Sequence, residues 1–390
     1  MNITLKKFIM EELDQSRSSG FKIMSLEDFV NGSRLDEADD KFLGANISRV
    51  SDKDMADYLA RSKAGEKGAK EKYDMPYVHS SNIEIKDDQG KTLDTEALKA
   101  MIKVRPAELL KKNEKLAHSG GGFIQFHNIG LPALRGLAVD ESTGEFIVVD
   151  TCPGAGACKV YCYARKGGYV QWKASSMSQT KVLNFLVNDP LGFKTMLESE
   201  IFAMVNAGDK KNIKHVIRWH DAGDFFSPEY LELAYAVARK FPTVDFYAYT
   251  KISNVAKGQK PSNFIINFSM GAKKEEEKKI DFTKTKSSIV VPKDVFVDLL
   301  ALEVGKGNKP KYLRDEKGRV KFKDDSSESE LKSRISKKYN IPVESILTYD
   351  EMRSTPPSGD TGKYNVIVRP KDGDDSAARA DVLGTYLLIH

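Results

Sequence analysis

Residues 213–249 read IKHVIRWHDAGDFFSPEYLELAYAVARKFPTVDFYAY and decide the fold. The apolar runs at 213–219 and 244–249 predict two strands. Between them, Ser227 followed by Pro228 and an acidic residue is typical of the first turn of a helix. A strand, a helix and a second strand in this order indicate a parallel sheet whose strands are joined by helices.

The same alternation continues on both sides of this stretch. Further strands are expected at residues 123–129, 134–140, 146–150, 264–269, 289–291 and 366–368, and further helices at 178–187 and 190–207. We therefore predict an α/β fold, specifically a partial (β/α) barrel with a mostly helical N-terminal region and a basic insertion. In such folds the loops at the carboxyl ends of the strands build the functional site.

Composition divides the chain into four predicted segments. Residues 1–115 are polar and mostly helical in pattern, 116–303 form the α/β core, 304–354 hold a charged insertion and helices, and 355–390 dock on the core. The sequence has no apolar run long enough to span a membrane and no signal peptide, which predicts a cytoplasmic protein without membrane contact.

The loop TCPGAGACKVYCYARK, residues 151–166, holds all three cysteines of the chain: Cys152, Cys158 and Cys162. Clustered thiols in a cytoplasmic protein favour a metal site over a disulfide framework. Three interpretations fit: free thiols, a zinc site completed by His220 or Asp224, or a [4Fe–4S] cluster. We favour the cluster, because three thiolates would leave one iron open for a substrate or cofactor.

A second candidate loop, HDAGDFF, follows the strand at 213–219. His220 and Asp221 are candidate catalytic residues, and Gly223 allows close approach of the backbone to a ligand that Asp224 would bind. Lys251, after the strand at 244–249, is a third catalytic candidate. The alternatives are a packed core histidine, a helix-capping loop with solvated carboxylates, and a solvated lysine.

The segment from Lys306 to Lys323 has eight basic and two acidic residues. Tyr312 and Phe322 lie among these charges, a pattern that fits contacts with a phosphate backbone and stacking on bases. A solvated surface loop is the alternative. The net charge of the whole chain, +5, does not by itself predict nucleic-acid binding.

Three motifs in order, CPGAGACKVYCYA, RWHDAGDFFSPEYL and FYAYTK, resemble those of the gene-product-eighty-eight family of uncharacterised phage proteins. The resemblance extends over about residues 131–270, and GDDSAARADVLGTYLLIH near the carboxyl end is similar to the family as well. It implies a phage protein in the cytoplasm of the host cell and leaves the activity open.

The cysteine loop also has a weaker resemblance to radical S-adenosylmethionine enzymes. There, a three-cysteine loop after the first barrel strand holds a cluster whose open iron binds the cofactor. The resemblance implies cluster ligation by the three cysteines, with Tyr163 as the aromatic residue beside the cluster, and cofactor binding by Gly223 and Asp224. The spacing here is C-x5-C-x3-C rather than the usual C-x3-C-x2-C, and Asp stands in place of Glu.

Three hypotheses follow for the function. The first is a radical-SAM-like iron–sulfur enzyme acting on an unknown substrate, such as a nucleotide or nucleic acid. The second is a zinc-stabilised accessory protein that binds nucleic acid through the basic segment. The third is a metal-dependent hydrolase that uses His220, Asp221 and Asp224.

Overall fold

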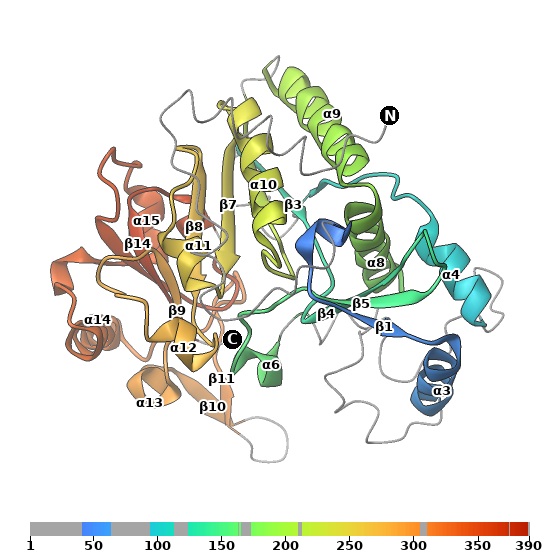
Figure 1. Cartoon of the computed structure of the whole chain (residues 1–390). Helices are drawn as coiled ribbons and strands as arrows, with labels where there is room; N and C mark the ends of the chain where they lie inside the picture. The colour runs from blue at the N-terminus through green and yellow to red at the C-terminus, as the bar shows by residue number, and fades with distance from the viewer. Residues whose placement is uncertain are drawn as a thin grey trace.

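The computed structural model describes residues 41–63, 94–112, 124–162, 164, 173–209, 213–304, 310–373 and 375–388. In this part of the chain, helices cover both faces of a large sheet, and a small sheet lies beside it (Figure 1). None of the helices described is both long and apolar enough to cross a membrane.

The large sheet contains nine strands from the described residues, in the order β12-β13-β14-β9-β8-β7-β6-β3-β2. Their bounds are β2 Lys111–Lys112, β3 Ile124–Ile129, β6 Lys214–Trp219, β7 Asp245–Thr250, β8 Phe264–Ser269, β9 Ser287–Val290, β12 Ile346–Thr348, β13 Tyr364–Val368 and β14 Val382–Leu387. Every neighbouring pair is parallel except β2 with β3. The predicted α/β core is confirmed. Within the described residues the sheet is open, with β12 and β2 as its edge strands. These strands do not close into the predicted partial barrel.

The two halves of the large sheet are wound in opposite directions. The chain steps from β3 through β6, β7 and β8 to β9, then starts again at the far edge with β12 and returns through β13 to β14. Right-handed connections put the helices of the two halves on opposite faces. Phe246 of β7 packs in the core with α10 (Pro228–Lys240), whereas Tyr247 packs with Ala377 of α16 (Asp375–Ala378). We call these faces the α10 face and the α16 face.

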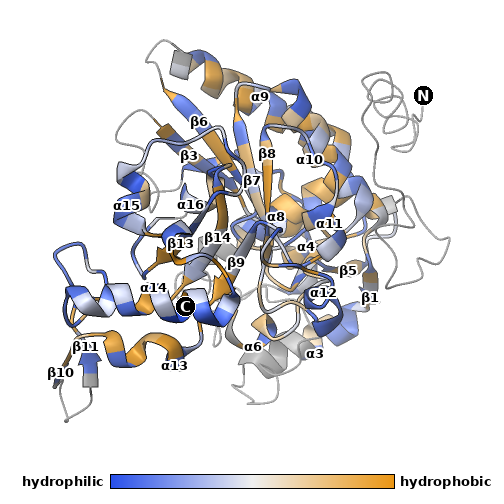
Figure 2. Ribbon diagram, turned by 90° about the vertical axis from the view of Figure 1, so that its left-hand side faces the viewer, coloured by the Kyte–Doolittle hydropathy of each residue, from blue (hydrophilic) through white to orange (hydrophobic). Residues whose placement is uncertain are grey.

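Among the described helices, α8 (Lys173–Asn188), α9 (Pro190–Asp209) and α11 (Ser253–Lys257) also cover the α10 face. Helix α14 (Asp325–Tyr339) packs on the same face against Ile289 of β9. The predicted start of α10 is confirmed: the Ser227 side chain accepts a hydrogen bond from the Tyr230 amide at 3.1 Å, and Pro228 occupies the first turn. The inward side of this helix and the strands beneath it are coloured as hydrophobic in Figure 2. The sheet is thus anchored on one side by a thick apolar layer.

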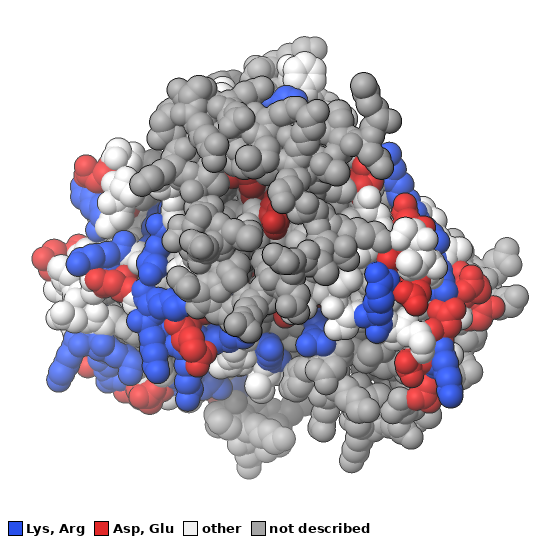
Figure 3. Space-filling view, viewed as in Figure 1, with Lys and Arg blue, Asp and Glu red and all other residues white. Residues whose placement is uncertain are grey.

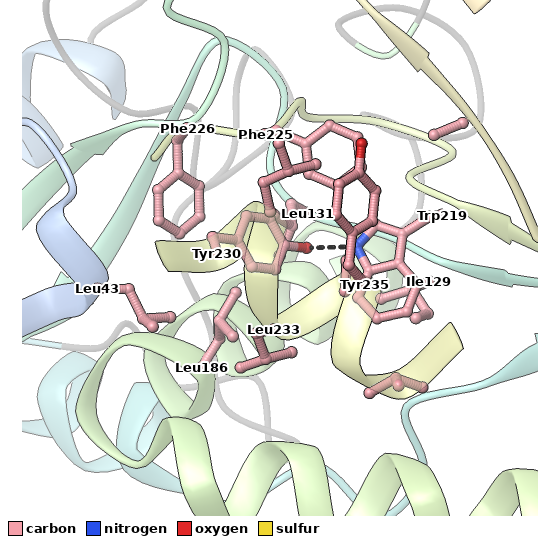
Figure 4. Packing of buried hydrophobic residues seen from close by; sticks show 14 of the residues in the cluster. Leu43, Ile129, Leu131, Leu186, Trp219, Phe225, Phe226, Tyr230, Leu233 and Tyr235 are labelled. Atoms are coloured by element: carbon pink, nitrogen blue, oxygen red, sulfur yellow. Dashed lines mark hydrogen bonds between the residues drawn. The ribbon is translucent and has the colours of Figure 1, made fainter. Parts of the chain in front are cut away.

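Aromatic side chains fill the centre of this layer. Trp219 packs against Phe246 and Phe264 with ring centroids 6.3 and 6.1 Å apart, and its indole nitrogen donates to the Tyr230 hydroxyl at 3.2 Å (Figure 4). Phe226 stacks on Tyr230 from the other side. The residues at the carboxyl end of β6 are therefore fixed by the core.

The small sheet joins β1 (Ile47–Val50), β5 (Phe146–Asp150) and β4 (Arg135–Val139) in antiparallel order β1-β5-β4 within the described residues. The strands predicted at 134–140 and 146–150 form the hairpin of β4 and β5, with Gly144 at a φ of 75° in its turn. Its strands are not part of the parallel sheet, contrary to the winding predicted from sequence. Because β5 pairs antiparallel on both edges, it has no edge left for a parallel neighbour.

The predicted four segments all contribute to the large sheet: β2 comes from 1–115, β3 and β6–β9 from 116–303, β12 from 304–354, and β13 and β14 from 355–390. The described part of the first segment has helices α3 (Asp52–Lys63) and α4 (Thr95–Lys103), together with β1 and β2. The remaining residues of that segment lie outside the described part of the chain. The division into segments stays a prediction.

Candidate functional site

The cysteine loop leaves β5 and docks on the carboxyl ends of strands in the large sheet. Its first residue, Thr151, accepts a hydrogen bond from the Asp224 amide at 2.8 Å, and its hydroxyl donates to the Pro132 carbonyl at 2.6 Å. The short helix α6 (Cys158–Tyr161) within the loop lies near α12 (Lys274–Glu277) in Figure 1, and the Cys158 amide bonds to the segment just before α12. The loop therefore reaches the edge predicted from sequence, although its strand belongs to the small sheet.

Two glycines allow this docking. Gly156 donates to the Gly271 carbonyl at 3.1 Å, and the Cys158 amide donates to the same oxygen at 3.0 Å. A Cβ on Gly156 would lie 2.0 Å from the Ala272 carbonyl oxygen, and one on Gly154 would lie 2.5 Å from the carbonyl oxygen of Lys251. The loop thus packs backbone against backbone, which only glycine permits at these positions.

The three thiols share one electrostatic environment. The Cys152 sulfur accepts the Leu134 amide at 3.2 Å. Burial and the charge of Asp224 raise the pKa of Cys152 well above its usual value. Burial also raises the pKa of Cys158, and the ammonium of Lys251 acts in the opposite direction. The charges of Cys158 and Cys162 raise the pKa of Cys152, and the charge of Cys162 raises that of Cys158, so the thiols influence one another electrostatically.

The donor types fit a thiolate-ligated metal, and all three donors lie on one docked loop. Cys162, however, packs against Ala133, Ala164 and Ala222. Among the described residues, no group of three or more His, Cys, Asp and Glu side chains is arranged to hold a metal ion. Binding a metal would therefore require rotation of cysteine side chains out of their present contacts.

His220 is a packed core residue. Its φ is 73°, which turns its side chain toward the α10 face, where Nε2 lies 2.8 Å from the Tyr230 hydroxyl. Its ring meets Phe225 edge-on at 4.7 Å. Burial, with a smaller contribution from Arg218, lowers the pKa of His220 to about 3. The imidazole is therefore neutral, and these contacts support the core-histidine interpretation.

Acid is expected to destabilise the fold through two buried histidines. The pKa of His127 is lowered to about 4 by burial and by His215 and Lys112, and the pKa of His220 is lowered to about 3. The unfolded chain binds protons on both near pH 6.5, whereas the folded chain does not, so the free energy of unfolding falls as pH drops from 6.5 toward 4. We expect a loss of about 1–3 kcal/mol per histidine.

Urea denaturation between pH 7 and pH 4.5 measures this effect. Asp224 acts in the opposite direction, because burial raises its pKa to about 6 and its carboxyl takes up a proton in the folded state first. A His127→Gln variant should show a shallower fall in stability than the unmodified protein. An equal fall in both would contradict the assignment to His127.

Asp224 joins the cysteine loop to two strands. One carboxylate oxygen accepts the Phe225 amide at 2.7 Å, and the other accepts the Lys251 amide at 2.8 Å. Its own amide donates to Thr151. Since backbone donors occupy both oxygens and the side chain is buried, its contacts are those of a residue that positions the loop.

The remaining predicted residues lie in different places. Gly223 has a φ of 88°, and a Cβ there would lie 2.7 Å from Leu131, so glycine is required for packing. Asp221 accepts from the Asn128 side chain at 3.1 Å at the end of β3. Lys251 donates to the hydroxyl of Ser269 at 2.8 Å, next to the loop. The side chain of Tyr163 lies outside the described residues.

The structure thus brings together the three cysteines, Asp224 and Lys251, and it separates His220 from them in the core. Sequence reasoning missed the loop after β8, where Ser269, Met270 and Gly271 bind Lys251 and the cysteine loop. The sequence feature that could have revealed this loop is the strand at 264–269, which is followed closely by a glycine, Gly271.

The described part of the basic segment is built into the fold. Arg319 forms ion pairs with Asp315, Asp350 and Asp372 at 2.7, 2.8 and 3.2 Å. The guanidinium of Arg369 lies 5.7 Å from the ring centre of Phe322. Basic and acidic side chains are mixed on both flanks of the face in Figure 3. These contacts do not indicate a nucleic-acid partner, which stays a prediction.

The motifs of the docked loop and of β6 to β8 are shared with known proteins. The model of the family described as "Gene product 88" matches residues 107–336, more than half of the chain. The chain belongs to the Gene product 88 family. The match includes the cysteine loop, Asp224, Lys251 and every parallel strand from β3 to β9, so the resemblance to this family over about residues 131–270 is confirmed.

Two curated relatives of the Gene product 88 family are phage proteins. The Gene 88 protein of Mycobacterium phage D29 is 35% identical over 148 residues, and that of Mycobacterium phage L5 is 30% identical over 147 residues. Each match covers 37% of this chain and 56% of the relative, so the chain spans about half the length of the curated relatives it matches. No solved structure matches. The chain thus shares a family with phage proteins, and the comparisons leave its activity open.

Proposed function

We propose that this phage protein is an iron–sulfur enzyme whose [4Fe–4S] cluster is ligated by Cys152, Cys158 and Cys162. The observation that carries the proposal is the docking of a three-thiol loop at the carboxyl edge of a parallel sheet. Functional sites in such folds are built at this edge. When bound, the cluster would supply one-electron chemistry.

The chain's own residues would position the loop and balance its charge. Asp224 links the loop to the ends of β6 and β7. The ammonium of Lys251 favours the charged form of Cys158, which is the form that ligates a metal. A rigid anchor and a nearby cation both favour a thiolate-ligated centre at this place.

S-adenosylmethionine is the cofactor that we propose for an open iron of the cluster. Its support is the resemblance of the cysteine loop to radical-SAM enzymes. Both oxygens of Asp224 are occupied by backbone amides, which gives no support to this carboxylate as the group that holds the cofactor's amine. Of the pair Gly223 and Asp224, the backbone of Gly223 is the part that we propose to contact the cofactor's amine.

The alternatives have less support from the contacts. A hydrolase would need His220, Asp221 and Asp224 to face one substrate, but His220 lies among aromatic rings and Asp221 is bonded to Asn128. A zinc site completed by His220 meets the same difficulty, since its Nε2 is bonded to Tyr230. Neither alternative has an observation that favours it over the cluster.

Purification without oxygen, followed by iron and sulfide analysis, tests the proposal. We expect about four irons per chain and a broad visible absorbance, both lost in a Cys152→Ala/Cys158→Ala/Cys162→Ala variant. Val160→Ala is the matched control, because Val160 lies in the same loop and is 74% exposed. A colourless protein with one zinc per chain would refute the cluster. With iron present, formation of 5′-deoxyadenosine on reduction with S-adenosylmethionine tests the cofactor separately.

A further inference from the structure

Three hydroxyl side chains lie side by side on adjacent strands of the large sheet. Ser269 ends β8, Ser288 lies in β9 and Thr385 lies in β14. Ser288 is the register partner of both Ser269 and Thr385. In-register residues of parallel neighbours point to the same face at a spacing of about 4.8 Å. We call Ser269, Ser288 and Thr385 the hydroxyl row.

The hydroxyl row lies on the α16 face. Asn267, two residues before Ser269, donates from its side chain to the Ala377 carbonyl of α16 at 3.0 Å. Side chains two apart in a strand share a face, so Ser269 and its partners point the same way. The row crosses from β8 over β9 to β14, where the two oppositely wound halves of the sheet meet. Ligands bind at such meeting points in open α/β sheets.

Two hydroxyls of the row are buried, and no described residue forms a hydrogen bond with them. Ser288 is 4% exposed and Thr385 is 3% exposed. Neither the Ser288 Oγ nor the Thr385 Oγ1 has a hydrogen-bond partner among the described residues. Buried hydroxyls in proteins are nearly always hydrogen-bonded, because leaving them unpaired is costly. Two such groups side by side indicate that something polar completes the row.

The charges around the row define what it accepts. The Lys251 ammonium donates to the Ser269 hydroxyl at 2.8 Å, which leaves the proton of that hydroxyl available for another acceptor. Arg218 points to the same face but is level with Tyr247 and Ile265, four residues before Ser269, so Lys251 is the cation that contacts the row. A row of O–H donors beside an ammonium suits an acceptor with negative charge.

We infer that the hydroxyl row binds an oxyanion, with the phosphate group of a small molecule as the class that fits. A phosphate offers several acceptor oxygens to the three hydroxyls and carries the charge that Lys251 attracts. A cationic ligand would be repelled by Lys251, and an apolar one would leave the buried hydroxyls unpaired. Phosphate binding by the row does not require the proposed cluster, because none of the three hydroxyl residues would ligate it.

Calorimetric titration of inorganic phosphate into the full-length protein at pH 7 tests the inference. The Ser288→Ala/Thr385→Val variant removes two hydroxyls with little change in shape, and we expect about tenfold weaker binding for each one lost. Ser287→Ala is the matched control: Ser287 lies on the same strand, its Oγ is equally buried and unpartnered, and its side chain points to the opposite face.

Thr385→Ser keeps the hydroxyl that Thr385→Val removes. This variant is expected to bind phosphate nearly as well as the unmodified protein. Metal content should be the same in all variants, which separates this test from that of the cluster. No phosphate binding by the unmodified protein would overturn the inference. Equal weakening by Ser287→Ala would also overturn it, and so would binding of ribose in place of phosphate.

Discussion

Replacing Gly156 with alanine is expected to detach the cysteine loop from the sheet and to lower metal affinity by about 10–100-fold. The added Cβ would lie 2.0 Å from the Ala272 carbonyl oxygen and 2.6 Å from the Lys273 nitrogen. Both are backbone atoms, so no side chain can turn away to make room. The hydrogen bonds of Gly156 and Cys158 to Gly271 would be lost in the same movement.

Iron content per chain and urea denaturation measure the two consequences. We expect a loss of about 1–3 kcal/mol in the free energy of unfolding, the usual cost of an added methyl group in a packed site. Gly359→Ala is the control, since nothing lies within 4 Å of a Cβ at that position. If the two variants hold equal amounts of metal, the docked loop does not position the ligands.

Replacing Arg379 with methionine is expected to destabilise the protein by about 3–5 kcal/mol. The Arg379 guanidinium donates to both oxygens of Asp381 at 2.9 and 2.7 Å, and to the carbonyls of Met352 and Thr355 at 2.9 and 2.8 Å. The Asp381 side chain is fully buried. Without its partner, this carboxylate would be left charged in a site from which water is excluded.

Chemical denaturation gives the size of this effect. Lys363→Met is the control, because the ion pair of Lys363 with Asp360 is exposed and is expected to contribute at most about 1 kcal/mol. The Arg379→Met/Asp381→Asn variant should recover part of the loss, since it removes the unpaired charge. A loss no larger than that of the control would show that Arg379 does not stabilise the buried carboxylate.

Local sequence signals were sufficient where neighbours along the chain determine structure. The Ser227 cap with Pro228 gave the start of α10, and the apolar runs beside it gave β6 and β7. Partners distant in sequence were not accessible in this way. Strand β12 has three residues and no pattern of its own, and its existence depends on pairing with β13.

In the candidate site too, local features could be predicted from sequence and long-range contacts could not. The cysteines stood out because they lie close together in the sequence. His220 was expected at a pocket because it follows a strand, but its positive φ turns the ring into the core. Asp224 was expected to bind a ligand, yet its second oxygen is bonded to the amide of Lys251, which lies 27 residues further along the chain. Such long-range bonds decide whether a polar side chain is free to act.

The position of β14 has a consequence for synthesis of the protein. This strand lies between β9 and β13, although β9 ends at Val290 and β14 begins only at Val382. As the chain leaves the ribosome, β9 has an unpaired edge until residues up to Leu387 have emerged. Exposed strand edges recruit other chains, so the nascent protein has an edge open to aggregation during this interval. Completion of the sheet, and with it of the hydroxyl row, is therefore a late folding event.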